Sequence, residues 1–191
     1  DSIIPTIDKV LAKAKISLKE LDGFAVGLGP GSFTSLRVGV STVKVLAFAT
    51  GKPVVGIPSL DVIAQGVFRN SPVDNIIVAS DAKRSLVYTA AYGLKKGALV
   101  RTGKYRLESI NKILVGITRK TFLVGDAISV FKDDIRKKKE IILAEEEFWH
   151  PQAVHLSELA QQKFLKKEYN DVDSLIPLYL YPEHCQVQNK K

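Results

Sequence analysis

The sequence predicts an α/β fold made of two lobes. Apolar segments of strand length alternate with segments of helical periodicity through residues 1–69, which is typical of a layered lobe with parallel strands. From residue 75 to residue 106, strand patterns follow one another with only short turns, which predicts a second lobe that opens with antiparallel pairing. The polar run at residues 69–72 separates the two patterns. We therefore place one lobe at residues 1–69 and the other at residues 70–191.

The elements of the first lobe follow from hydrophobic periodicity and from the residues that end each element. Apolar side chains share one face of residues 2–14, and Pro5 is tolerated in a first helical turn. Gly51 and Pro53 end the long second helix, as these residue types commonly do. We predict, in order, a helix at residues 2–14, a strand at 21–28, a helix that ends near residue 50, a strand at 53–57 and a helix at 60–68 capped by Ser59.

The second lobe is expected to begin as a meander of strands and to end with a helix. Its first turn is the polar segment at residues 81–85, and Pro151 suits the first position of a helix, where no amide donor is needed. The tail at residues 177–182 is apolar and extended, so we expect it to cover a core. The predicted strands are residues 75–80, 86–92, 98–106, 121–124 and 140–143, and the predicted helix runs from residue 151 to about residue 166.

The most distinctive motif is the run Gly-Pro-Gly-Ser-Phe-Thr-Ser-Leu-Arg-Val-Gly at residues 29–39. Gly29 and Gly31 around a proline predict a tight turn, because glycine tolerates positive φ and proline fixes its own φ. Ser32 and Thr34 can cap the amide groups at the start of the helix that follows. A strand, a glycine turn and a helix N-terminus together form a place where an anion can rest.

The helix that this motif opens is apolar on two sides. Arg37 and Lys44 are the only charged residues between residues 36 and 50, and we expect them at the rim of any interface. One apolar face comprises Leu36, Val40, Val43 and Ala47, and a second comprises Val38, Val45 and Ala49. One face can pack on a sheet, whereas the other needs a further covering. Two explanations remain for the second apolar face: full burial within one lobe, or a protein interface. The interface is the more specific hypothesis.

The order of these features resembles the TsaB family, also called YeaZ. The family signature is similar to the run at residues 29–39, and Asp81-Ala82-Lys83-Arg84 is similar to the start of the hairpin in its second lobe. Further resemblance lies in residues 2–8, 54–60 and 177–180 and in Tyr88. The resemblance covers nearly the whole chain and implies an actin-like, sugar-kinase-type (ASKHA) fold, with mixed sheets flanked by helices. Family members normally begin with strands ahead of the first helix, so we expect the first lobe to lack its first strands.

The resemblance also implies a function in tRNA modification. TsaB proteins are non-catalytic partners of TsaD, which transfers a threonylcarbamoyl group to an adenosine beside the tRNA anticodon (t6A), and the ATPase TsaE joins the same machinery. Membership implies a homodimer when the protein is alone, tRNA contact only through the complex, and an interface on the first two helices. The residues implied for that interface are Ile3, Ile7, Val10, Leu11, Leu36, Arg37, Val40, Val43, Lys44 and Ala47. The family has Gly at the position of Ser35, whose hydroxyl an approaching partner would meet.

An enzyme is the alternative interpretation, either an actin-fold nucleotide hydrolase or a glycopeptidase-like enzyme. A weak anion or nucleotide loop would use Gly29, Gly31, Ser32, Thr34, Asp81 and Asp126. Ala82-Lys83-Arg84 stands where glycines would let backbone amides close on phosphate, so Asp81 and Asp126 are better explained as turn residues. His150 and His155 fall on different sides of a helix and are interpreted as isolated surface residues. We therefore expect no catalytic residue, no metal and no cofactor.

Composition favours a cytoplasmic protein and leaves RNA binding open as a third hypothesis. The 191 residues include 28 Lys and Arg against 20 Asp and Glu, and the net charge of +8 permits attraction to nucleic acid. The basic run at residues 136–139 is flanked by acidic residues, which is typical of a solvated surface. The single Cys185 excludes an intramolecular disulfide and favours a reducing compartment. No secretory signal or membrane span is visible in the sequence.

Overall fold

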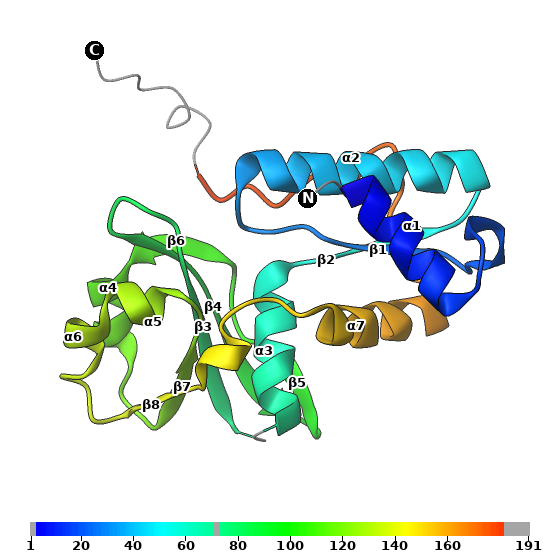
Figure 1. Ribbon diagram of the computed structural model, residues 1–191. Coiled ribbons are helices and arrows are strands. Elements are labelled where there is room, and N and C mark those ends of the chain that lie inside the picture. Colours follow the sequence, from blue (N-terminus) through cyan, green and yellow to red (C-terminus); the bar gives the residue numbers. More distant parts are fainter. Residues whose placement is uncertain (1–2, 71–72, 182–191) are drawn as a thin grey trace, which may run out of the picture.

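The computed structural model describes residues 3–70 and 73–181, which form two α/β lobes with a helix between them (Figure 1). The first elements in chain order are α1 (Ile3–Ala14), the 3-10 helix η1 (Leu18–Glu20), β1 (Phe24–Gly27), α2 (Phe33–Thr50), β2 (Val54–Ile57) and α3 (Ser59–Asn70). This order of helices and strands confirms the prediction for the first lobe. α2 ends at Gly51, whose φ of 67° is the left-handed conformation that terminates many helices.

β1 and β2 form a two-stranded parallel sheet with a helix on each face. The register runs from the pair Phe24 and Val54 to the pair Gly27 and Ile57. The core between this sheet and α2 comprises Phe24, Val26, Val40, Ala47, Val54 and Leu175. The core on the other face, under α7 (Ala153–Leu165), comprises Val55, Ile57, Val62 and Ala160. The predicted layered lobe with parallel strands is therefore confirmed.

The second lobe is built on a six-stranded mixed sheet. β3 (Asn75–Asp81) is antiparallel to β4 (Leu86–Lys95) and parallel to β7 (Thr121–Val124). β8 (Ile141–Leu143) extends the parallel side, whereas β5 (Ala98–Arg101) and β6 (Arg106–Ser109) both pair with β4. The connections carry α4 (Ile110–Gly116), α5 (Ala127–Val130), α6 (Lys132–Ile135) and the 3-10 helix η2 (Glu146–Phe148). The antiparallel opening of this lobe agrees with the prediction.

Three details of the second lobe differ from the prediction. The strand expected at residues 98–106 is split into β5, which ends at Arg101, and β6, which begins at Arg106. α4, α5 and α6 have no counterpart among the predicted elements, since hydrophobic periodicity does not show in such short helices. The helix expected from Pro151 begins at Ala153, with Gln152 as its N-cap.

Helix packing crosses the boundary between residues 1–69 and residues 70–191. α3 belongs to the first range, yet its Leu60, Ile63, Ala64 and Val67 lie in the core of the six-stranded sheet. α7 belongs to the second range but covers β1 and β2, and Leu175 joins the core under α2. Residues 71–72 of the expected boundary lie outside the described residues. The predicted boundary in the sequence therefore stays a prediction. In the structure, α3 and α7 each pack on the sheet of the other lobe, so the two lobes interlock (Figure 1).

Candidate protein-interaction surface

The glycine loop before α2 is closed by a backbone hydrogen bond and by the side chain of Leu36. Gly29 has a φ of +87°, and a Cβ at this position would lie 2.5 Å from Cδ1 of Leu36. The amide of Ser59 donates to the carbonyl oxygen of Gly29 at 2.7 Å, which ties the loop to the start of α3. The loop therefore needs glycine at this position for both its backbone conformation and its space.

Ser32 stands at the N-cap position of α2, but its side chain makes no capping hydrogen bond. Its Oγ instead accepts a hydrogen bond of 3.1 Å from the hydroxyl of Ser35. Thr34 lies in the first turn of the helix and is exposed. The predicted cap by Ser32 is therefore wrong.

The inner face of α2 packs on the sheet of its own lobe. Val40 is 3% exposed and Ala47 is 2% exposed, and both belong to the core between α2 and the sheet. Val43 is half-buried against the same core, and Leu36 is half-buried over the glycine loop. The implied interface needs correction at Val40 and Ala47, because both side chains are buried within their own lobe.

The outer face of α2 is apolar and open to solvent. Val38 is 49% exposed, Val45 is 66% exposed and Phe48 is 84% exposed. Val38 and Val45 belong to the second apolar face that the sequence predicts, and Ala49 is exposed beside them. Sequence reasoning missed Phe48, although its spacing of three residues from Val45 places it on the same side of the helix. We call Val38, Val45, Phe48 and Ala49 the outer face of α2.

α1 is an amphipathic helix without a buried residue. Ile3, Ile7 and Leu11 are half-buried against the lobe, whereas Val10 is exposed. Ile4, which is absent from the predicted interface, is exposed as well. A helix whose apolar side chains gain so little cover from its own lobe is stabilised only weakly by packing.

Arg37 and Lys44 contact the C-terminal segment of the same chain. Nε of Arg37 donates to the hydroxyl of Tyr179 at 3.2 Å. Nζ of Lys44 donates to the carbonyl oxygens of Asp173 and Leu175, at 3.0 and 3.3 Å. Lys44 therefore fastens the C-terminal segment to α2, while Arg37 remains exposed, and the position of both at the rim of an interface stays a prediction.

Asp81 and Asp126 are brought together at one end of the six-stranded sheet. Oδ1 of Asp126 accepts hydrogen bonds of 2.8 Å from the Ser80 hydroxyl and from the Asp81 amide. Asp81 accepts from both the amide and the ammonium group of Lys83. Burial alone would raise the pKa of Asp81, but the hydrogen bonds and charge of Lys83 outweigh it and lower that pKa. These bonds within the turns favour the interpretation of both aspartates as turn residues.

His150 and His155, the histidines of the described residues, do not gather into a site. His155 is buried at 8% exposure, which corrects its interpretation as a surface residue, because α7 lays it against Gly66 of α3. His150 is exposed, and His184 and Cys185 lie outside the described residues. Within residues 3–70 and 73–181, no group of three or more His, Cys, Asp or Glu side chains is arranged to hold a metal. Over the same residues, no helix is long and apolar enough to cross a membrane.

Comparison with known proteins identifies relatives over nearly the whole chain. The TsaD family model, described as tRNA N6-adenosine threonylcarbamoyltransferase, matches residues 1–187. The tRNA threonylcarbamoyladenosine biosynthesis protein TsaB of Haemophilus influenzae is 30% identical over 190 residues, which cover 95% of this chain and 79% of that protein. The protein of the same name from Escherichia coli is 27% identical over 183 residues, which cover 93% and 78% of the two chains.

The comparison with solved structures leads to the same family. A crystal structure from Pseudomonas aeruginosa, of an uncharacterized protein with similarity to peptidase YEAZ, has a TM-score of 0.82 at 25% identity and covers 94% of this chain and 82% of that chain. YeaZ from Pseudomonas aeruginosa has a TM-score of 0.81 at 26% identity. The fold is therefore the actin-like, sugar-kinase-type α/β fold. The chain belongs to the TsaB (YeaZ) family of tRNA threonylcarbamoyladenosine biosynthesis proteins.

Proposed function

We propose that this chain is a non-catalytic adaptor in tRNA threonylcarbamoyladenosine biosynthesis, and that it pairs with a TsaD-type threonylcarbamoyltransferase through α1 and the outer face of α2. The observation that carries the proposal is the exposure of large apolar side chains along one helix, with Phe48 at 84%. An aromatic ring flanked by aliphatic side chains is typical of an interface anchor. Burying one such side chain contributes about 1.5–3 kcal/mol.

The same outer face supports a homodimer when no transferase is present, so that self-association and pairing with the transferase exclude each other. In this proposal the TsaE-type ATPase and the tRNA are reached through the transferase, and the cytoplasm is the compartment of action. The chain supplies no catalytic group of its own. Ile4 and Val10 on α1 extend the apolar surface beyond α2.

Co-elution in gel filtration with a purified TsaD-type transferase tests the adaptor proposal. We expect Val45→Glu and Phe48→Glu each to weaken pairing by at least about tenfold, because each places a charge in the buried centre of the interface. Both side chains are exposed, so the circular dichroism spectrum of the isolated chain should change little.

Val115→Glu is the matched control. Val115 is 75% exposed on α4 in the second lobe, so this variant adds the same charge at an equally open apolar position far along the chain from α2. It should leave co-elution intact. Pairing that survives Val45→Glu and Phe48→Glu, or that is lost equally with Val115→Glu, would show that the outer face of α2 is not the interface.

A further inference from the structure

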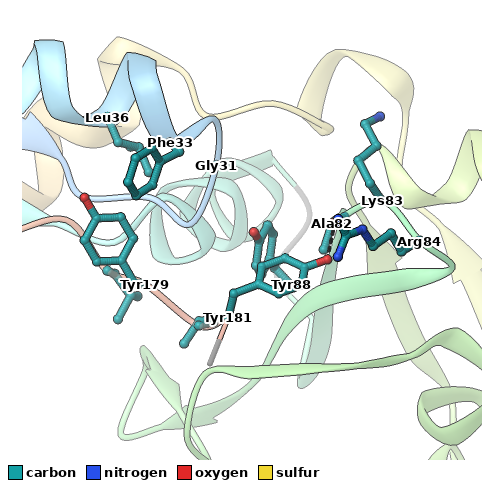
Figure 2. Close-up of a pocket in the computed structure, with 11 residues that line it drawn as sticks. Gly31, Phe33, Leu36, Ala82, Lys83, Arg84, Tyr88, Tyr179 and Tyr181 are labelled. Atoms are coloured by element: carbon teal, nitrogen blue, oxygen red, sulfur yellow. Dashed lines mark hydrogen bonds between the residues drawn. The ribbon is translucent and has the colours of Figure 1, made fainter. Parts of the chain in front are cut away.

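A cavity of about 440 Å³ lies where α3, α7 and the connection between β5 and β6 meet, and we call it the α3–α7 cavity. Its volume falls within the range of small-molecule sites. It shares no lining residue with the larger cavity of about 600 Å³ in Figure 2, which is walled by aromatic rings and by Lys83 and Arg84. The residues of the α3–α7 cavity that matter most here are Pro58, Asp61, Arg101, Tyr105, Leu159 and Lys166.

The α3–α7 cavity is lined by charged side chains of both signs. The acidic groups are Asp61 and Glu168, and the basic groups are Arg101, Lys163 and Lys166. Within residues 3–70 and 73–181, none of these five side chains forms an ion pair. The opposite charges therefore line one cavity without reaching one another, and a ligand that carries both charges can compensate both.

The carboxylate of Asp61 has room for one more hydrogen-bond donor. Its Oδ1 accepts from the hydroxyls of Tyr92 and Tyr105, at 2.7 and 2.8 Å, whereas its Oδ2 accepts from Tyr105 at 2.7 Å. A carboxylate oxygen has two lone pairs, so Oδ2 can accept a further bond. Because hydroxyl groups donate without carrying a charge, the negative charge of Asp61 stays uncompensated, and an ammonium group matches it.

The ring of Tyr105 sets the separation between Asp61 and Arg101. The hydroxyl end of the ring bonds to Asp61, and Cζ of Arg101 lies 3.9 Å from the ring centre, so the guanidinium group rests on the same ring. Nη1 of Arg101 donates to the carbonyl oxygen of Gly103, which helps to hold the guanidinium group and leaves further N–H donors free. A carboxylate and a guanidinium group thus stand about one tyrosine ring apart, each with capacity for another partner.

We propose that the α3–α7 cavity binds a free α-amino acid with an aliphatic side chain. Its ammonium group bonds to Asp61, its carboxylate bonds to Arg101, and its side chain lies against Pro58 and Leu159. The two charged groups of an α-amino acid are joined through one carbon atom, and with a hydrogen bond of about 2.8 Å at each end they span a tyrosine ring. A simple anion would be repelled by the two carboxylates of the cavity, and a simple cation by its three basic groups. This site is separate from the outer face of α2 and does not depend on the adaptor proposal.

Titration of the ¹⁵N-labelled full chain, followed by its amide resonances, tests the proposal with three probes. L-leucine should bind with a dissociation constant of about 1 mM or below and should shift the resonances of residues around Asp61 and Arg101. 4-methylpentanoate is leucine without its ammonium group, and 3-methylbutylamine is leucine without its carboxylate. Each should bind at least about tenfold more weakly than L-leucine, because each leaves one charged group of the cavity without its partner.

Variants assign the binding to the cavity. Arg101→Gln should weaken L-leucine at least about tenfold and leave 3-methylbutylamine unchanged, because the amine has no carboxylate. Asp61→Asn should weaken L-leucine and leave 4-methylpentanoate no weaker. If the Asn variant does not fold, the comparison of L-leucine with 4-methylpentanoate tests the same contact in the unaltered chain. Arg136→Gln, which removes an exposed arginine at the end of α6 that does not line the cavity, is the matched control for net charge.

Three results overturn this inference. The first is an unchanged, well-dispersed spectrum of the chain in L-leucine at about ten times the expected dissociation constant. The second is binding of 4-methylpentanoate or 3-methylbutylamine as tightly as L-leucine, which would show that the cavity does not recognise both charges. The third is an equal loss with Arg101→Gln and Arg136→Gln, which would indicate diffuse charge attraction. Phe48→Glu should leave L-leucine binding intact, because Phe48 does not line the cavity, so failure here is separable from failure of the adaptor proposal.

Discussion

Asp61 joins α3 to the six-stranded sheet through hydroxyl groups. Tyr92 of β4 donates to Oδ1 of Asp61 at 2.7 Å, and Tyr105 donates to Oδ1 and Oδ2 at 2.8 and 2.7 Å. Cζ of Arg101 lies 3.9 Å from the centre of the Tyr105 ring. Burial, and then the charge of Asp61, raises the pKa of both tyrosines far above the usual range.

This arrangement predicts a loss of stability in alkaline solution. Unfolded tyrosines titrate near pH 10, whereas Tyr92 and Tyr105 keep their protons to higher pH in the folded chain. The unfolded state therefore loses protons first, so the contribution is fully present below about pH 10 and falls as the pH rises above it. In urea unfolding from about pH 9 to about pH 11, Tyr92→Phe and Tyr105→Phe should reduce the fall in the free energy of unfolding. Tyr169→Phe is the control at an exposed tyrosine, and an unchanged fall in all three variants would refute the argument.

The two apolar faces of α2 differ in their surroundings: one packs on the sheet and the other is open to solvent. Hydrophobic periodicity located both apolar faces, and the prediction that one face stays open is supported by the exposure of Val38 and Val45. Val40 and Ala47, which the family resemblance implies for the interface, lie on the buried face. Periodicity shows that a helix has more apolar surface than one neighbour can cover, but it does not show which side the sheet takes. That choice depends on the pairing of β1 with β2.

The attachment of the C-terminal segment to α2 depends on Lys44. Lys44→Met keeps most of the aliphatic stem and removes the donor, so the carbonyl oxygens of Asp173 and Leu175 lose a charged partner. We expect the free energy of unfolding to fall by about 1–2 kcal/mol and proteolysis near residues 173–181 to become faster. Lys13→Met, at an exposed position at the end of α1, is the control. Equal proteolysis in both variants would show that other contacts hold the segment.

For the whole molecule, the interlocking of the lobes is the feature that sequence patterns could not reveal. The order of strands and helices was predictable, because each element shows its own periodicity and its own end signals. The sheet on which each helix packs was not predictable, because the apolar faces of α3 and α7 suit either sheet. The exposure of Phe48 could not be predicted from the sequence for the same reason, since exposure arises only from the assembled fold.

Separating the chain at the lobe boundary should therefore abolish folding. A fragment of residues 1–69 leaves Leu60, Ile63 and Val67 of α3 without the six-stranded sheet, and a fragment of residues 70–191 leaves α7 without β1 and β2. We expect each fragment alone to give poorly dispersed amide resonances, and an equimolar mixture to recover dispersion. A well-dispersed spectrum from either fragment alone would show that the lobes fold independently.

The closure of the first lobe by α7 and Leu175 also governs the timing of folding during synthesis. β1 and β2 leave the ribosome well before the structures that cover them, because the covering helix begins at Ala153 and the covering leucine is Leu175. The nascent polypeptide therefore carries a half-covered apolar sheet while the strands of the second lobe are translated. Chaperones that act on growing chains have a long interval in which to bind it, and the first lobe can reach its native packing only after α7 and Leu175 have been translated.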